Sequence, residues 1–93
     1  MRDIRHDDQG HRFTCDTDGH VTYVAYRPLA GRCLDFYTTY TPPPVRGRGT
    51  AARVVAAALR WAEENGYQVV PSCWFVAEVI DRNPRWQGLV APR

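Results

Sequence analysis

Hydrophobic and polar residues alternate along the first half of the chain and recur with a helical period in the second half. The alternation runs through residues 11–40, HRFTCDTDGHVTYVAYRPLAGRCLDFYTTY, in three stretches. Asp18-Gly19 separates the first two stretches as a typical hairpin dipeptide, and residues 28–32, PLAGR, supply a second turn. The pattern therefore predicts a meander of three antiparallel strands. Side chains expected on one face of the third strand are Leu34, Phe36, Thr38 and Tyr40.

A helical pattern follows three prolines, Pro42 to Pro44, which cannot donate to a strand ladder and so end the third strand. Apolar residues then recur at helical spacing from Thr50 to Asn65, and Gly66 stands where a helix-ending glycine is expected. The residues predicted to face the core are Val54, Val55, Ala58, Leu59 and Ala62.

The last third of the chain predicts one strand and one helix. Residues 67–73, YQVVPSC, are typical of a short strand buried on both faces and paired in parallel. Residues 74–83, WFVAEVIDRN, predict a second helix that Asn83-Pro84 ends. The element order β-β-β-α-β-α indicates an α/β fold with a mixed sheet, in which the helix at 50–65 crosses between parallel strands. The inward residues expected in the second helix are Phe75, Val76, Val79 and Ile80.

Composition limits the classes of protein that remain. Ninety-three residues with 44% apolar side chains predict a single folded domain, 1–93, of which the polar residues 1–10 are expected to be partly loose. A net charge of +2 without a basic stripe argues against nucleic acid as a partner. An RNA-binding use of the RGRG loop and the strand aromatics stays a third, weaker alternative.

Targeting and metal signals are weak. The start MRDIRHDDQGHRF is too charged for a signal peptide, and no apolar run approaches membrane-spanning length. Cys15, Cys33 and Cys73 form no CxxC pair, and the three histidines, His6, His11 and His20, fit no metal spacing and are expected to be solvated. The expectation is a cytoplasmic protein with reduced thiols, no metal and no membrane contact.

The segment PPPVRGRGT, residues 42–50, places two glycines where a helix should begin, although glycine is a poor helix former. Bare backbone there lets a ligand's oxygens approach the unpaired amides and partial positive charge of the helix N-terminus. Arg46 and Arg48 add bidentate donors. The loop is therefore interpreted as a phosphate site, but it is not a Walker A loop, since the chain has no lysine, and it lacks the third glycine of GxGxxG.

The segment VRGRGTAARVV resembles motif A of the GNAT superfamily of acyl-CoA-dependent N-acyltransferases, whose pattern is R/Q-x-x-G-x-G/A. Arg46, Gly49 and Ala51 match this motif in register. Residues 69–90, VVPSCWFVAEVIDRNPRWQGLV, resemble the small single-domain branch of the superfamily, in which a strand ending in P-x-C precedes a helix and a terminal aromatic segment. The resemblance covers about residues 13–90.

This resemblance implies an acetyl-CoA-dependent N-acetyltransferase acting on a primary amine, with a non-enzymatic acyl-CoA-binding or partner-binding module of the same fold as the alternative. The pyrophosphate would bind the loop and helix start, and the pantetheine arm would run along the end of the third strand, in a cleft where that strand and the next separate. A backbone N–H near the strand end would stabilise the developing oxyanion. Residues implied to contact acetyl-CoA are Thr39, Tyr40, Thr41, Val45, Arg46, Gly47, Arg48, Gly49, Thr50, Ala51 and Asn83.

The catalytic residues are less defined. Within the branch, the cysteine at the position of Cys73 is implied as the acid for the leaving thiolate or as an acyl acceptor, whereas a free cysteine alone is more often a core residue. Thr38 stands where the branch commonly has a histidine as base, and a threonine cannot act as a base near neutral pH. Asp35 and Glu78 are substitutes without geometric support, and Trp86 replaces the branch's usual tyrosine.

Overall fold

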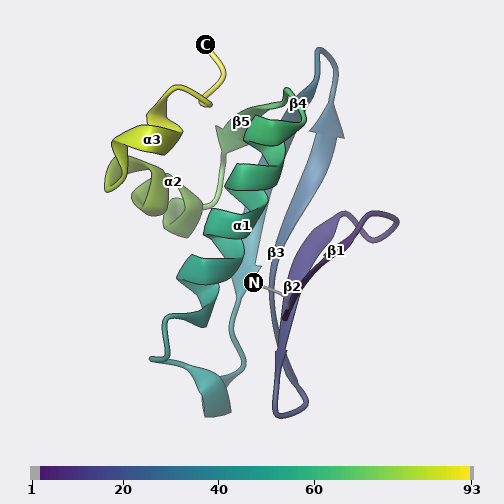
Figure 1. Ribbon diagram of the computed structural model, residues 1–93, viewed down its shortest axis with the longest axis vertical. Coiled ribbons are helices and arrows are strands. Elements are labelled where there is room, and N and C mark those ends of the chain that lie inside the picture. Colours follow the sequence, from purple (N-terminus) through teal and green to yellow (C-terminus); the bar gives the residue numbers. More distant parts are fainter. Residues whose placement is uncertain (1–2, 93) are drawn as a thin grey trace.

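A computed structural model describes residues 3–92 of the chain (Figure 1). The strands are β1 (Ile4–Asp7), β2 (Arg12–Thr17), β3 (His20–Leu29), β4 (Cys33–Tyr40) and β5 (Gln68–Pro71). The helices are the 3-10 turn η1 (Pro43–Val45), α1 (Thr50–Glu64), α2 (Trp74–Asp81) and α3 (Pro84–Gln87).

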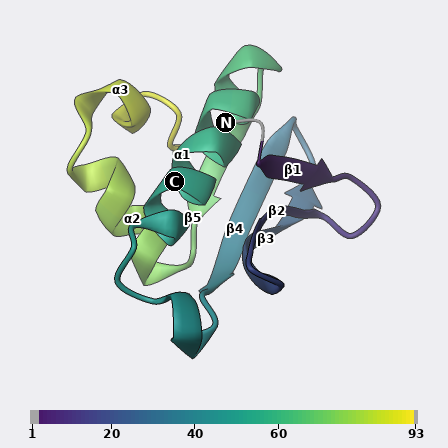
Figure 2. The same cartoon turned by 60° about the horizontal axis from the view of Figure 1, so that its bottom comes forward.

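The five strands form one mixed sheet in the order β1-β2-β3-β4-β5. The first three neighbouring pairs are antiparallel, and β4 pairs with β5 in parallel. A parallel pair requires a crossover, which α1 supplies. Figure 2 shows the helices on one face of the sheet, so the molecule has two layers. The predicted α/β fold, crossover helix and parallel strand are confirmed.

The meander has four strands rather than the predicted three, because Ile4–Asp7 pairs with β2. Ile4 packs against the core, and the His6 ring stacks on Phe13 with 4.1 Å between centroids. The expectation of a loose segment at residues 1–10 is therefore wrong for β1. The alternation in IRHD was missed because one of its two inward side chains is an imidazole. Residues 1 and 2, which the same expectation included, lie outside the described residues.

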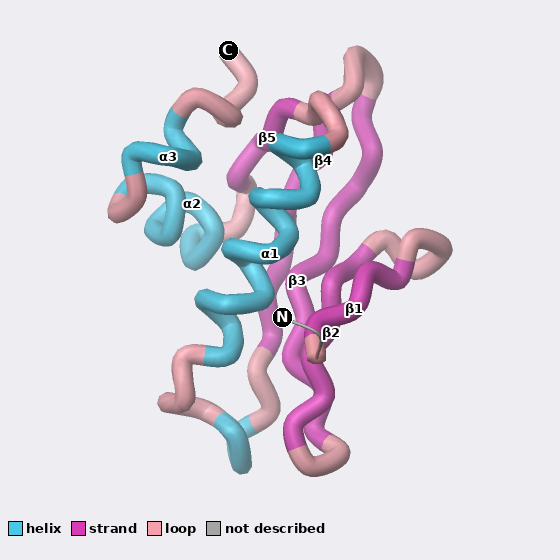
Figure 3. Tube along the Cα trace, in the orientation of Figure 1, coloured by secondary structure: helices cyan, strands magenta, loops and turns pink. Residues whose placement is uncertain are grey.

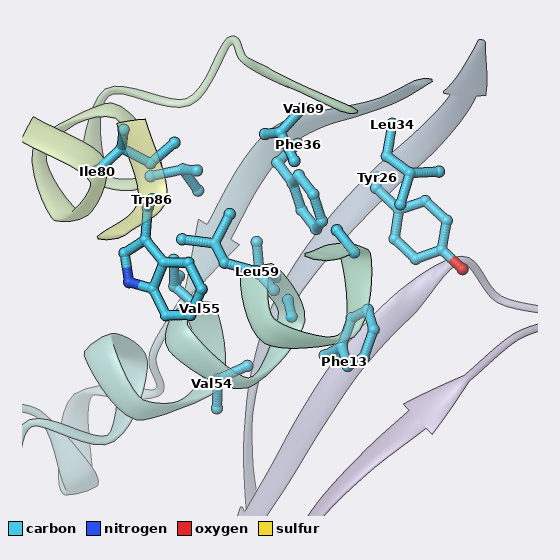
Figure 4. Close-up of a cluster of buried hydrophobic side chains, with 14 of the residues drawn as sticks. Phe13, Tyr26, Leu34, Phe36, Val54, Val55, Leu59, Val69, Ile80 and Trp86 are labelled. Atoms are coloured by element: carbon cyan, nitrogen blue, oxygen red, sulfur yellow. The ribbon is translucent and has the colours of Figure 1, made fainter. Parts of the chain in front are cut away.

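The core lies between α1 and the inner face of the sheet, with α2 and α3 beside α1 (Figure 4). Phe36 from β4, Leu59 from α1 and Val69 from β5 are almost fully buried there. Burial of such side chains is the main favourable term in folding and fixes α1 against β4. All of the core residues predicted for α1 are buried: Val54, Val55, Ala58, Leu59 and Ala62.

The chain after β5 forms two helices where one was predicted. In α2, Val76 and Ile80 are buried, whereas Phe75 and Val79, also expected inward, are half-buried. The side chain of Asn83 then caps α3 by accepting a hydrogen bond from the backbone N–H of Arg85 at 3.1 Å. This short helix turns Trp86 into the core. It has too few residues for a hydrophobic period, so the sequence pattern did not reveal it.

A β-bulge interrupts the pairing of β3 and β4. Tyr26 pairs with Phe36, whereas the preceding residue of β3, Ala25, pairs with Thr38. Tyr37 is therefore an extra residue on β4, and beyond it the side chains exchange faces. An extra residue of this kind re-aims every side chain that follows it.

The bulge overturns part of the predicted face of β4. Thr39 pairs with Val24, which is fully buried, so Thr39 lies on the inner face with the helices. Thr38 and Tyr40 lie on the outer face, where the Tyr40 ring is 5.9 Å from that of Tyr23. The prediction holds for Leu34 and Phe36 and is wrong for the two residues after the bulge.

The strands β4 and β5 separate where the bulge begins. The last hydrogen bond on this side of β4 runs from the N–H of Cys73, just after β5, to the Phe36 carbonyl at 2.9 Å. From there to Tyr40, β4 is paired with β3 only. On β5, Val69 is buried and Val70 is half-buried, so the prediction of a strand buried on both faces is correct for one face only. The helices cover that face and leave the other open.

The first edge of the sheet is held to α1 by an aromatic cluster around His6. Besides stacking on Phe13, the imidazole meets the edge of Trp61 at 4.6 Å, and its Nε2 forms a 2.7 Å hydrogen bond with the Tyr26 hydroxyl. Burial raises the pKa of Tyr26 to about 12, so this hydroxyl stays protonated. The prediction that His6 is solvated is wrong, since its side chain is only 19% exposed.

We expect His6 to make the stability of the fold depend on pH. Burial lowers the pKa of His6 below its ordinary value, against the opposing attraction of Asp8 and Asp7. The unfolded chain therefore binds a proton at His6 more readily than the folded protein does. The contribution of His6 to the free energy of unfolding is complete above the ordinary histidine pKa. It is lost as the pH falls through the lower pKa of His6 in the folded state. The melting temperature of the wild type should exceed that of His6→Gln more at about pH 7.5 than at about pH 5.5. Parallel curves for the two proteins would contradict this.

Candidate functional site

A cavity of about 480 Å³ lies where three segments meet: the end of β4, the loop leading into α1, and the start of α2. Figure 3 shows η1 as a short helical turn set within that loop. The lining residues are Thr39, Tyr40, Thr41, Val45, Arg46, Gly47, Arg48, Gly49, Thr50, Ala51, Ala52, Cys73, Trp74 and Phe75.

The cavity gathers nearly all of the residues that the sequence assigned to a cofactor. Every one of them from Thr39 to Ala51 lines it, and so does Cys73. Asn83 is the exception, because it is absent from the lining and its side chain caps α3 instead. The structure thus brings together residues 39–52 and residues 73–75, which 20 intervening residues separate in the sequence, and it leaves Asn83 out.

The glycines of the loop are required by backbone conformation. Gly47 has φ +82° and Gly49, which is the N-cap of α1, has φ +74°, in the left-handed region that favours glycine. An added Cβ would meet no atom within 4 Å at either position. The loop surface above the helix start is therefore open, which is the condition for a ligand to approach the backbone.

The start of α1 has no negatively charged side chain in its first turn. Its first turn is Thr50-Ala51-Ala52-Arg53, without a carboxylate, and no side chain caps it. Within residues 3–92 the first amide of this turn with an acceptor is that of Arg53, which donates to the Gly49 carbonyl at 3.2 Å. The amides before it are donors that a helix leaves without intrahelical acceptors, and such donors are suited to an anion's oxygens.

Two arginines border this helix start in different ways. Arg46 donates from Nε to the Thr41 carbonyl at 2.8 Å, a contact that holds the loop against the end of β4 and leaves the outer guanidinium nitrogens available. Arg48 lies 3.9 Å from a carboxylate oxygen of Asp18, with both side chains exposed. An exposed pair of this kind is weak, so Arg48 can turn to a bound anion at little cost.

Cys73 joins β5 to α2 and lies half-buried at the wall of the cavity. Its sulfur is 3.5 Å from the Thr39 hydroxyl, a contact that depends on the bulge having turned Thr39 inward. The Cys73 N–H donates to the Phe36 carbonyl, and the Cys73 carbonyl accepts from the N–H of Ala77. These two hydrogen bonds fix the backbone around the thiol. The other two cysteines, Cys15 and Cys33, are buried in the sheet.

Three lining residues were not expected from the sequence: Ala52, Trp74 and Phe75. Trp74 is 74% exposed, the most exposed of the large apolar side chains described, and its ring meets Phe75 edge-on at 5.7 Å. Helical periodicity placed Phe75 in the core and gave no role to Trp74. The position of Trp74 and Phe75 directly after Cys73 could have indicated that they line the cavity, because the first turn of a helix lies close to the residue before it.

None of the residues considered as a base lines the cavity. Thr38 is on the outer face of β4, and Glu78 is on α2 with its carboxylate 4.0 Å from Arg82. Asp35 is on β4, paired with Arg27 and with Val70, and its Oδ1 is buried without a hydrogen-bond partner among residues 3–92. No cluster of potential metal ligands occurs within those residues.

Comparison with known proteins decides the family. A family model described as GCN5-related N-acetyl-transferase matches residues 12–89. The chain belongs to this family. The match spans β2 to α3 and includes every residue that lines the cavity. Membership makes an N-acetyltransferase-type function the natural interpretation of the fold.

Relatives in the family are distant but similar over their length. Protein NATD1 from Bos taurus is 28% identical over 88 residues, covering 92% of this chain and 78% of that protein, and the Homo sapiens protein of the same name gives the same values. The solution structure of a GCN5-like protein from Staphylococcus aureus superposes with a TM-score of 0.74 at 18% identity, covering 100% of this chain and 93% of that one. That structure supports the fold alone.

None of the helices in residues 3–92 is long and apolar enough to cross a membrane.

Proposed function

We propose that the protein binds acetyl-CoA in the cavity between β4, α1 and α2 and transfers its acetyl group to a primary amine. The supporting observation is that the residues assigned from the family motif, from Thr39 to Ala51, line one cavity together with Cys73. A volume of about 480 Å³ lies within the range of small-molecule sites.

The chain offers a separate surface for each part of the ligand. The amides at the start of α1, with Arg46 and Arg48, suit the pyrophosphate, because they present donors and positive charge without a competing carboxylate. Beyond Phe36 the edge of β4 is no longer paired with β5, so its backbone groups suit the amide-rich pantetheine arm. The thioester then lies toward Cys73.

When bound, acetyl-CoA supplies an activated acyl group as a thioester. The amine nitrogen forms the new C–N bond, the C–S bond breaks, and the proton lost from nitrogen ends on the CoA sulfur. The N-terminal amides of α2 are donors for the oxygen that becomes negative. The Cys73 thiol, held near the Thr39 hydroxyl, is the candidate acid for the leaving sulfur or the candidate acyl acceptor.

A non-enzymatic acyl-CoA-binding module is the second candidate. It is favoured by one observation, that Thr38 occupies the position at which this branch commonly has a histidine and lies away from the cavity. Both candidates require the same ligand and differ only in product. Mass spectrometry of mixtures with acetyl-CoA and a panel of primary amines distinguishes them, since only the enzyme forms acetylated amine.

Acetyl-CoA should raise the melting temperature of the protein. A ligand that binds only the folded state stabilises it by about 2.7 kcal/mol when its concentration is about 100 times Kd. S-acetylpantetheine, which lacks the pyrophosphate, is the matched control and should produce a much smaller shift. Equal shifts for the two compounds would contradict the assigned role of the α1 terminus, and no shift with acetyl-CoA would contradict the proposed function.

A further inference from the structure

Trp74 places an open aromatic surface beside the reactive end of the cavity. It is the first residue of α2, directly after Cys73, and it is 74% exposed. Phe75 meets it edge-on and supports the ring from one side. An exposed aromatic side chain in the lining of a cavity is a candidate contact for a ligand. Trp74 belongs neither to the proposed pyrophosphate site nor to the edge of β4 proposed for the pantetheine arm.

The charge around the cavity disfavours a cationic acceptor. Among residues 3–92, two charged side chains line the cavity, and both are positive: Arg46 and Arg48. The N-termini of α1 and α2 both open onto it and add partial positive charge. No carboxylate of residues 3–92 lines the cavity to pair with an ammonium group, whereas an uncharged amine needs no such partner.

We propose that the acceptor is an aromatic amine whose nitrogen is uncharged at neutral pH, and that its ring lies on the indole of Trp74. This inference rests on the proposed function, whose acceptor it specifies. An aromatic ring stacks on or meets an indole with a favourable geometry that an aliphatic amine lacks. Trp74 is in this account a specificity-determining residue.

An uncharged aromatic amine also suits a cavity that none of the residues considered as a base lines. An alkylamine resembling the lysine side chain is uncharged to only about one part in a thousand near neutral pH and must lose a proton before it attacks. Thr38 cannot take that proton, and Asp35 and Glu78 do not line the cavity. The nitrogen lone pair of an aromatic amine is available from the outset. Its proton leaves after the C–N bond has formed and is transferred to the sulfur that the broken C–S bond releases.

The test compares two amines that share a ring and differ in charge, 4-methoxyaniline and 4-methoxybenzylamine. With saturating acetyl-CoA near neutral pH, and with enzyme-free mixtures subtracted, 4-methoxyaniline should be acetylated with a kcat/KM at least about tenfold higher. Three results would overturn the inference if acetyl-CoA still raises the melting temperature: equal rates, a preference for 4-methoxybenzylamine, or no product from either amine. Each of them would leave acetyl-CoA binding intact. No thermal shift with acetyl-CoA would overturn the proposed function and the inference with it.

Variants of Trp74 test the site of the ring. Trp74→Ala should raise KM for 4-methoxyaniline by about fivefold to tenfold with little change in kcat, and Trp74→Phe should recover most of that loss. Both variants keep the backbone amide of residue 74, so the thermal shift with acetyl-CoA should change far less than KM for 4-methoxyaniline does. The exposed position makes folding of both variants the expectation, and their melting temperatures check it. An unchanged KM in Trp74→Ala, or a loss confined to acetyl-CoA affinity, would place the acceptor elsewhere.

Discussion

Replacing Gly49 by aspartate is expected to abolish acetyl-CoA binding while the protein remains folded. Gly49 caps α1 at φ +74°, and its missing side chain leaves open space above the helix start. An aspartate would put a carboxylate where the pyrophosphate is proposed to bind, and like charges in that position repel. We expect the affinity to fall by about 100-fold or more, measured by calorimetric titration.

Gly31→Asp is the matched control for this variant. Gly31 has φ +77° in the turn between β3 and β4, and it too has no atom within 4 Å of an added Cβ. Both variants therefore carry the same charge change and a similar backbone strain of about 1 kcal/mol or slightly more. Gly31 is not in the cavity, so its variant should bind acetyl-CoA like the wild type. Similar losses in the two variants, or none in Gly49→Asp, would refute the phosphate site.

Cys73 is expected to be the first cysteine that iodoacetamide modifies in the folded protein, and bound acetyl-CoA should slow that reaction about tenfold at ten times Kd. The thiol is half-buried at the cavity wall, whereas Cys15 and Cys33 are 1% and 9% exposed within the sheet. Their slower modification is the internal reference, read by mass spectrometry of the intact protein and its peptides. If Cys73 is labelled at the same rate with and without acetyl-CoA, the thiol does not lie in the acetyl-CoA site.

The variant Cys73→Ala separates a functional thiol from a packing residue. If the thiol acts in the reaction, turnover should fall with little change in melting temperature, because the side chain already borders a cavity. If it only fills space, the variant should lose on the order of 1 kcal/mol of stability with unchanged turnover. An acetyl adduct on Cys73 after brief incubation with acetyl-CoA would favour the acyl-acceptor role.

The sequence predicted the elements whose signals are local. The helix α1 was predicted to within one residue, because its apolar stripe is continuous and Gly66 adopts the left-handed φ of +75° that ends a helix. The cavity residues from Val45 to Ala51 were predicted for the same reason, since the motif and the helix start form one segment. The loop needs no distant contact to present its amides.

Features that depend on distant partners were missed. The bulge at Tyr37 has no glycine or proline to mark it and arises from the pairing of β4 with β3, so the inward turn of Thr39 could not be predicted from alternation alone. The strand β1 was missed because His6 becomes an inward residue only when Phe13 and Trp61 enclose it. Trp74 was predicted only as the start of a helix, and its exposure follows from where α2 begins against the cavity.

The most direct test of the proposed acetyl-CoA site is amide chemical-shift mapping of the ¹⁵N-labelled protein during titration with acetyl-CoA. The proposed site predicts that the amides of residues 39–41, 47–51 and 73–75 shift together with one dissociation constant, while those of β1 and β2 stay in place. Shifts centred on β1 and the Trp61 side of α1, or an unchanged spectrum at millimolar acetyl-CoA, would contradict it.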